Sequence, residues 1–187
     1  AARKLKTVLV PFYWGAQFLG AMLAVIVINL ITNNALHLDF SHLWNMNWAM
    51  FGIELVGTMV FMFGLAAAMN RRSLDAWGSA LGAGLSLVAG LVVASSLFAT
   101  VQGSVDTSQI TSIDKVPHEL RVKGATLNPA VALAATEQSD STITGSRADK
   151  NEKQVSRLSL EVILGTALGA VIGGNLYLMI AGSRRDQ

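Results

Sequence analysis

Four long apolar stretches separated by polar segments dominate the pattern of hydrophobic and polar positions along the chain. They run over residues 11–31, 48–69, 79–98 and 158–181. Each stretch has close to the roughly 20 residues that a helix needs to cross the hydrocarbon core of a bilayer. The pattern therefore predicts an all-α membrane protein with four transmembrane helices. A fifth apolar segment, at 124–136, interrupts the long polar region before the last span.

This fifth segment reads "GATLNPAVALA" over residues 124–134 and is too short to cross a bilayer. Proline is favoured at the first position of a helix, and asparagine is a favoured N-cap. Pro129 and Asn128 stand in this order before the helix-forming run 130–135. The segment therefore predicts a re-entrant half-helix that begins at Asn128. The alternative from these residues alone is a surface loop with a short amphipathic helix.

A half-helix of this kind has chemical consequences at its N-terminus. It would bring backbone N–H groups and a partial positive charge to membrane depth. Irregular backbone is tolerated there only when it is buried in protein or lines a wet cavity. The amide of Asn128 could cap the helix and also donate a hydrogen bond to a passing solute. The positive end would disfavour cations while neutral solutes pass.

Composition supports a membrane protein and excludes several other classes. The chain has 187 residues, of which 52% are hydrophobic and only 14% are charged, against about 25% charged residues in soluble domains. The net charge of +2 is too small to suggest nucleic acid as a partner. With no cysteine, the chain has neither a disulfide framework nor a thiolate metal site. The lipid bilayer is the partner that composition predicts.

The distribution of basic residues predicts the orientation. Half of them lie before the first span, between the second and third, and after the fourth, whereas segment 32–47 has none. The residues concerned are Arg3, Lys4, Lys6, Arg71, Arg72, Arg184 and Arg185. The other seven lie in the long segment 99–157, where seven acidic residues balance them. We therefore expect a multi-pass protein of the plasma membrane, with both termini in the cytoplasm and with 32–47 and 99–157 outside.

Small residues recur at the spacing of helix contacts. Ala16 and Gly20 in the first span, and Gly165, Gly169 and Gly173 in the last, form small-xxx-small faces. Such faces allow two helix backbones to approach closely. They predict close helix packing within the bundle.

Few side chains in the sequence suggest chemistry of any other kind. Glu54 lies inside a span, where an ionisable group tends to face protein or water. His37 and His42 share an external linker with Asp39, and we expect solvated loop residues there rather than metal ligands. The polar segment 137–157 is expected to be a solvated external loop. Catalytic and phosphate-binding motifs are absent from the sequence, so we expect neither an enzyme nor a cofactor.

Three motifs together give a resemblance to a known family. They are "YWGAQFLGA" (13–21), "ELVGT" (54–58) and "GATLNPAVALA" (124–134). The chain resembles the aquaporin or major intrinsic protein family, including its aquaglyceroporins, whose members pass water, glycerol or other small neutral solutes. The family fold has two inverted repeats, each with three spanning helices and one Asn-Pro-Ala half-helix. The resemblance implies that residues 1–187 form a single partial domain, without the first two helices and the first half-helix.

The resemblance also implies roles for residues near the half-helix. Asn128 would be the hydrogen-bond donor at mid-membrane, and Leu127 and Ala130 would shape the pore wall. Glu54 would brace the half-helix by accepting backbone hydrogen bonds. Pro129 and Gly124 would support the same half-helix.

Two positions depart from the family pattern in ways that affect selectivity. The family's second motif carries an arginine after Asn-Pro-Ala, and Val131 stands there. Gly90 falls about where water-selective members carry a histidine and glycerol-conducting members a small residue. Both positions predict a constriction that is less polar and wider. The motif could belong to a diverged second repeat or descend from a first repeat.

The sequence thus predicts a passive transmembrane channel for water or for small neutral solutes such as glycerol. The alternatives are a non-conducting membrane assembly or structural subunit with a channel-derived fold, and a half-channel completed by another chain. The resemblance implies a homo-oligomer, typically a tetramer, or a complementing membrane chain as a partner.

Overall fold

Four long helices and one short half-helix make up the membrane part of the fold. The computed structural model describes residues 9–32, 38–71, 74–110, 112, 115–145 and 154–183. Among these residues, four helices are long and apolar enough to cross a membrane. They are α1 (Val10–Thr32), α2 (Trp48–Asn70), α3 (Ala76–Ser104) and α7 (Leu160–Ser183), and the half-helix is α5 (Pro129–Ala134). The fold class predicted from the sequence is confirmed.

Side-chain caps fix where two of the long helices begin. Asn47 precedes α2 and accepts a hydrogen bond from the backbone N–H of Met50 (3.0 Å). Asp75 precedes α3 and accepts one from Gly78 (2.7 Å). These caps satisfy N–H groups that have no partner within the helix. α3 therefore starts at Ala76, three residues before the apolar run at 79–98 from which the sequence predicted it.

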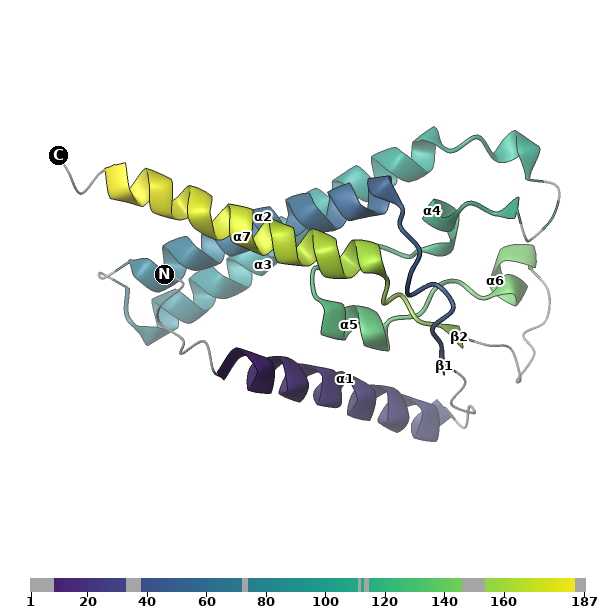
Figure 1. Cartoon of the computed structure of the whole chain (residues 1–187), viewed down its shortest axis with the longest axis horizontal. Coiled ribbons are helices and arrows are strands. Elements are labelled where there is room, and N and C mark those ends of the chain that lie inside the picture. Colours follow the sequence, from purple (N-terminus) through teal and green to yellow (C-terminus); the bar gives the residue numbers. More distant parts are fainter. Residues whose placement is uncertain are drawn as a thin grey trace.

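The closest packing in the molecule joins α2 and α7, which lie side by side in Figure 1. A Cβ atom on Gly165 would lie 2.9 Å from the carbonyl oxygen of Phe51. Cβ atoms on Gly169 and Gly173 would collide with the carbonyl oxygens of Leu55 and Met59. The glycine face predicted for the last span therefore does permit backbone-to-backbone contact. We call these three residues the glycine stripe of α7.

The small residues of α1 behave differently. α1 packs chiefly against the half-helix α5, and it stands apart from the α2–α3–α7 bundle in Figure 1. A Cβ atom on Gly20 would meet nothing within 4 Å. The close approach predicted for this face is therefore not made within the part of the chain that the structure describes.

Apart from the connection between α2 and α3, the connecting segments meet at one end of the bundle (Figure 1). They contain a 3₁₀ turn, two short helices and two short strands, which pair in parallel with Leu38 opposite Gln154. These elements are η3 (Thr107–Gln109), α4 (His118–Arg121), α6 (Asp140–Thr144), β1 (Leu38–Asp39) and β2 (Gln154–Val155). The strand pair was not predictable from the sequence, because each strand has only two residues.

The polar segment 137–157 corrects the expectation of a fully solvated loop. Residues 146–153 lie outside the described residues. Glu137, Ser156 and Arg157 are buried, with relative exposures of 6%, 1% and 3%. The ends of the segment fold inward because they pair with other loops: Glu137 N–H donates to Val155 and Arg157 N–H to Ala135 (2.9 Å each).

Candidate functional site: a cavity at the start of the half-helix

Asn128 and Pro129 start α5 as helix-capping rules require. Asn128 has extended backbone angles (φ −157°, ψ 124°), and its Oδ1 accepts a hydrogen bond from Ala130 N–H (2.9 Å). Pro129 occupies the first turn, where its missing N–H leaves no bond unmade. Because Oδ1 is used by the cap, the Nδ2 group of Asn128 is left as a donor.

A buried carboxylate from α2 holds the segment just before Asn128. Glu54 Oε1 accepts hydrogen bonds from Thr126 N–H (2.9 Å) and from the Thr126 hydroxyl (3.1 Å). Its Oε2 accepts one from Leu127 N–H (2.8 Å). Leu127 has φ +52°, in the left-handed region, where an L-residue costs about 1–2 kcal/mol. The bonds to Glu54 hold this unfavourable turn in place.

A buried arginine balances the charges behind the half-helix. Arg157 Nη1 donates to Glu161 Oε1 (2.7 Å) and to the Ser159 hydroxyl (3.0 Å). Its Nη2 lies 3.8 Å from Glu54 Oε1. Glu161 also accepts the backbone N–H of Asn47 (2.7 Å). Arg157, Glu54 and Glu161 therefore each have an opposite charge nearby, as buried ions need.

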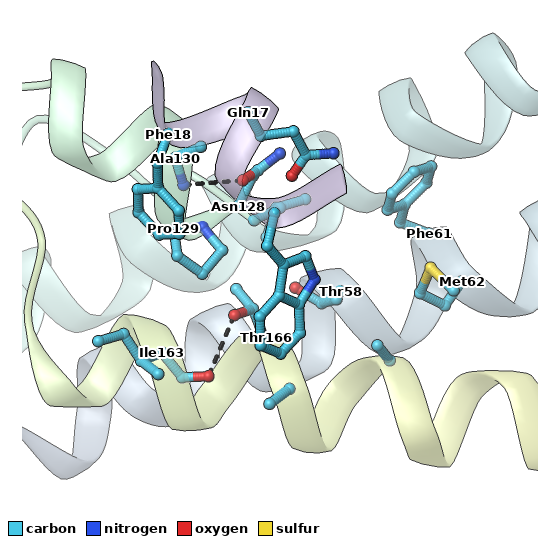
Figure 2. Close-up of a pocket in the computed structure, with 14 residues that line it drawn as sticks. Gln17, Phe18, Thr58, Phe61, Met62, Asn128, Pro129, Ala130, Ile163 and Thr166 are labelled. Carbon is cyan, nitrogen blue, oxygen red and sulfur yellow. Dashed lines mark hydrogen bonds between the residues drawn. The ribbon is translucent and has the colours of Figure 1, made fainter. Parts of the chain in front are cut away.

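A cavity of about 350 Å³ lies between α1 on one side and α2 and α7 on the other. The start of α5 forms part of its wall, as Figure 2 shows. Most of its lining is apolar, and no charged side chain is among the described residues that line it. The lining residues are Trp14, Gln17, Phe18, Thr58, Phe61, Met62, Leu127, Asn128, Pro129, Ala130, Ile163, Thr166, Ala167 and Ala170.

A few polar groups reach this apolar cavity from different elements. In Figure 2, the side chains of Gln17 from α1 and Asn128 from the start of α5 extend into the same space. The hydroxyl of Thr58 is buried and has no hydrogen-bond partner within the described part of the chain. The hydroxyl of Thr166 donates to the Val162 carbonyl of its own helix (2.7 Å). An amide donor therefore faces an uncharged cavity, and Thr58, whose buried hydroxyl has no partner among the described residues, lies in the cavity wall.

The structure brings together some of the residues predicted for the pore and separates others. Leu127, Asn128 and Ala130 line the cavity, whereas Gly90 and Val131 do not. Gly90 is buried at the contact between α3 and α2, where a Cβ atom would lie 2.7 Å from the Gly57 carbonyl oxygen. Val131 is 51% exposed. The locations of Gly90 and Val131 therefore give no support to the role in a selectivity filter that the sequence led us to expect.

Gly124 lies at the approach to the half-helix. Its φ of +157° is a value that residues with a side chain rarely adopt. A Cβ atom there would meet nothing within 4 Å. Glycine at this position therefore serves the backbone conformation and not close packing.

Three polar residues of the cavity were not predicted as site residues. Gln17 and Thr58 belong to the motifs "YWGAQFLGA" and "ELVGT", which carry the family resemblance. Thr58 follows Glu54 by four residues, so both lie on one face of α2. That spacing was the signal that could have identified Thr58. Thr166 is adjacent to Gly165 in the glycine stripe and carried no signal of its own.

The fold and the cavity define an integral membrane protein of the helical-bundle class. The sequence model of the major intrinsic protein family matches residues 1–106, more than half of the chain. The chain belongs to this family, whose members are membrane channels for water and small solutes and not enzymes. No curated protein and no solved structure gives a match. The family match ends before the half-helix, so the description of α5 rests on the structure and the Asn-Pro-Ala sequence.

Proposed function

We propose that the chain forms the wall of a passive channel for water and small neutral solutes of the size of glycerol, with Asn128 as a solute-contacting donor. The observation that carries this proposal is the uncharged cavity at the start of α5, which Asn128, Gln17 and Thr58 reach. An ion entering such a cavity would lose its hydration without meeting an opposite charge, which is costly. Neutral solutes carry a much smaller desolvation penalty.

Hydrogen bonding in the cavity suits a hydroxylated solute. The Nδ2 group of Asn128 can donate to a solute oxygen, and the Thr58 hydroxyl can both donate and accept. The remaining wall is mostly apolar and fits the carbon backbone of a polyol. A solute oxygen therefore finds partners in place of water, while few bonds hold it, so it can leave again.

The size of the cavity supports solutes larger than water. Its volume of about 350 Å³ is at the lower end of the range for small-molecule sites. Liquid water takes about 30 Å³ per molecule, so the cavity has room for a three-carbon polyol.

The positions of Glu54, Pro129 and Gly124 support a structural role beneath the channel wall. Glu54 would brace the turn at Leu127, and Pro129 would start α5 without an unpaired N–H. Gly124 would allow the unusual backbone before it. Together they would hold the Asn128 amide at the cavity.

The orientation proposed from charge has support from the arrangement of the helices. α1 begins and α7 ends at one end of the bundle in Figure 1, and α4, α6 and the strand pair lie towards the other end. In the sequence, basic residues precede α1, follow α2 and follow α7, which are the helix termini at the first of these ends. We propose that this end is cytoplasmic and that the membrane is the plasma membrane.

Osmotic measurements on proteoliposomes test the channel proposal. Vesicles with the protein should shrink several times faster than protein-free vesicles under a water gradient, and glycerol should enter them faster. Asn128→Ala and Thr58→Val should each slow glycerol entry. Asn175→Ala is the matched control, because Asn175 is an exposed amide of α7 whose side chain, within the described part of the chain, bonds its own helix (2.8 Å to Val171 O). Rates equal to those of protein-free vesicles for both solutes would refute the proposal.

A half-channel completed by a second chain is the other candidate. The observation that favours it is the exposure of α1, where Phe12 and Leu19 are 73% and 69% exposed and contacts are chiefly with α5. Permeability per protein should then rise as more copies are placed in each vesicle. A permeability strictly proportional to the copy number would favour a pore within one chain or a preformed oligomer.

A further inference from the structure

Two histidines and a glutamate from three separate loops meet at the end of the bundle where the connecting segments gather. His42 follows β1, His118 opens α4, and Glu137 follows α5. Glu137 Oε1 lies 3.1 Å from His42 Nδ1 and 3.5 Å from His118 Nδ1. One ligand atom from each of the three residues lies within 4.8 Å of the other two. We propose that these residues bind a divalent transition-metal ion, with zinc as the preferred ion.

The distances fit the coordination geometry of zinc. Zinc binds imidazole nitrogen and carboxylate oxygen at about 2.0–2.2 Å, usually as a tetrahedron. Neighbouring ligand atoms of such a tetrahedron lie about 3.3 Å apart by this geometry. The two nitrogen–oxygen distances to Glu137, 3.1 and 3.5 Å, lie on either side of this value. The rings of His42 and His118 are not stacked, with an interplanar angle of 79°, so both ring edges can face one ion.

The second nitrogen of His118 is held as in known metal sites. His118 Nε2 lies 2.9 Å from Glu161 Oε1. Glu161 is fully buried and is itself held by Arg157 (2.7 Å). A carboxylate that accepts the N–H of a metal-bound histidine fixes the tautomer and orients the ring. With its proton on Nε2, His118 presents the lone pair of Nδ1 to His42 and Glu137.

The burial of Glu137 favours a cation close by. Its side chain is 3% exposed, and its Oε2 atom is buried without a hydrogen-bond partner in the described part of the chain. The ion pairs found for it there are with the two histidines. If both imidazoles are neutral, the carboxylate is buried without an opposite charge, which is strongly unfavourable. A metal ion would supply the charge and would also occupy the unpaired oxygen.

The ligand types select the class of ion. Two imidazole nitrogens and one carboxylate suit zinc and other late first-row metals, whereas calcium and magnesium prefer oxygen ligands alone. The His42 side chain is 27% exposed, so an ion can enter from solvent. Three protein ligands leave a fourth position for water. The bound ion would join three loops beside the half-helix, and this role does not depend on the channel activity.

Zinc binding to the full chain tests the proposal. The protein would be purified in detergent without a histidine tag, treated with a chelator, and titrated with Zn²⁺ by calorimetry. We expect one ion per chain, and a Co²⁺ complex with the absorption spectrum of a tetrahedral site. His42→Ala and Glu137→Gln should each weaken binding by about tenfold or more, because second-shell changes alone cost about 10–100-fold.

A matched control completes this experiment. Asp106→Asn changes an exposed carboxylate that accepts a hydrogen bond from Ser108 N–H. It should leave Zn²⁺ affinity unchanged. Absence of saturable Zn²⁺ binding in the unmodified protein would overturn the proposal and would mean that a proton balances Glu137. Unchanged binding in both His42→Ala and Glu137→Gln would also overturn it.

Discussion

Replacing Glu54 by glutamine changes one oxygen of a buried side chain and tests the brace beneath the half-helix. The carboxylate accepts from Thr126 N–H and hydroxyl through one oxygen and from Leu127 N–H through the other. Glutamine has one acceptor oxygen, so at least one of these N–H groups would face an NH₂ group. The variant would lose one hydrogen bond to a charged acceptor and leave one buried donor without a partner.

The magnitude follows from these contacts. A hydrogen bond to a charged group contributes about 1.5–3 kcal/mol, and an unpaired buried donor costs about 1–3 kcal/mol. The left-handed turn at Leu127 would also lose part of the restraint that holds it. We expect Glu54→Gln to lower the free energy of unfolding by about 3 kcal/mol. For a chain of this length that corresponds to a fall in melting temperature of roughly 6–12 °C.

Thermal unfolding in detergent, followed by circular dichroism of the helices, measures this change. Glu119→Gln is the matched control, because Glu119 Oε1 accepts one hydrogen bond from the Asn47 side chain (2.6 Å) and a glutamine oxygen can replace it. Glycerol entry into vesicles should also fall in Glu54→Gln, since the Asn128 amide follows the turn that Glu54 holds. If Glu54→Gln has a melting temperature no lower than that of Glu119→Gln, the proposal that Glu54 stabilises the turn before the half-helix is wrong.

Three further substitutions test the packing and the charges. Gly169→Ala should lower the free energy of unfolding by about 1–3 kcal/mol through overpacking, because the new Cβ would collide with α2. Gly174→Ala is the control and should leave the stability unchanged, because a Cβ there would meet nothing within 4 Å. Equal melting temperatures for the two variants would contradict the glycine-stripe contact. Gly90→Ala should also destabilise the protein but leave the ratio of glycerol to water permeability unchanged; a changed ratio without destabilisation would restore the filter role. Arg157→Met should cost about 3–5 kcal/mol because it leaves buried carboxylates without their cation, measured by the same melting experiment; a melting temperature equal to that of the unmodified protein would refute the charge balance.

The membrane part of the fold could be predicted because the bilayer restricts it so strongly. A span needs about 20 apolar residues, and the four apolar runs satisfy that rule. The start of the half-helix could be predicted at Asn128 because capping depends on neighbouring residues alone. The positions of Gly90 and Val131 could not be predicted, because they depend on which face of an element meets the cavity. The faces of α3 differ little in hydrophobicity, so the sequence could not show which face of this helix points towards the cavity.

Local sequence patterns could not predict the contacts between charged groups at the end of the bundle where the connecting segments gather. His42 and Glu137 are separated by 95 residues in the sequence, yet their side chains lie 3.1 Å apart. A segment rich in polar residues predicts exposure, and that rule failed for Arg157 and Glu137 because both pair with partners from other segments. Recognising such pairs requires the tertiary structure.

The position of the glycine stripe in the sequence has a consequence for biosynthesis. Leu55 of α2 contacts Gly169 of α7, which the ribosome adds 114 residues later. At a translation rate of about 5–20 residues per second, α2 is synthesised roughly 6–23 s before this partner residue. Glu54 meanwhile has neither Thr126 nor Arg157 to pair with. Its charge is costly in lipid alone, so during synthesis α2 needs a protonated carboxyl group, water or another protein beside it.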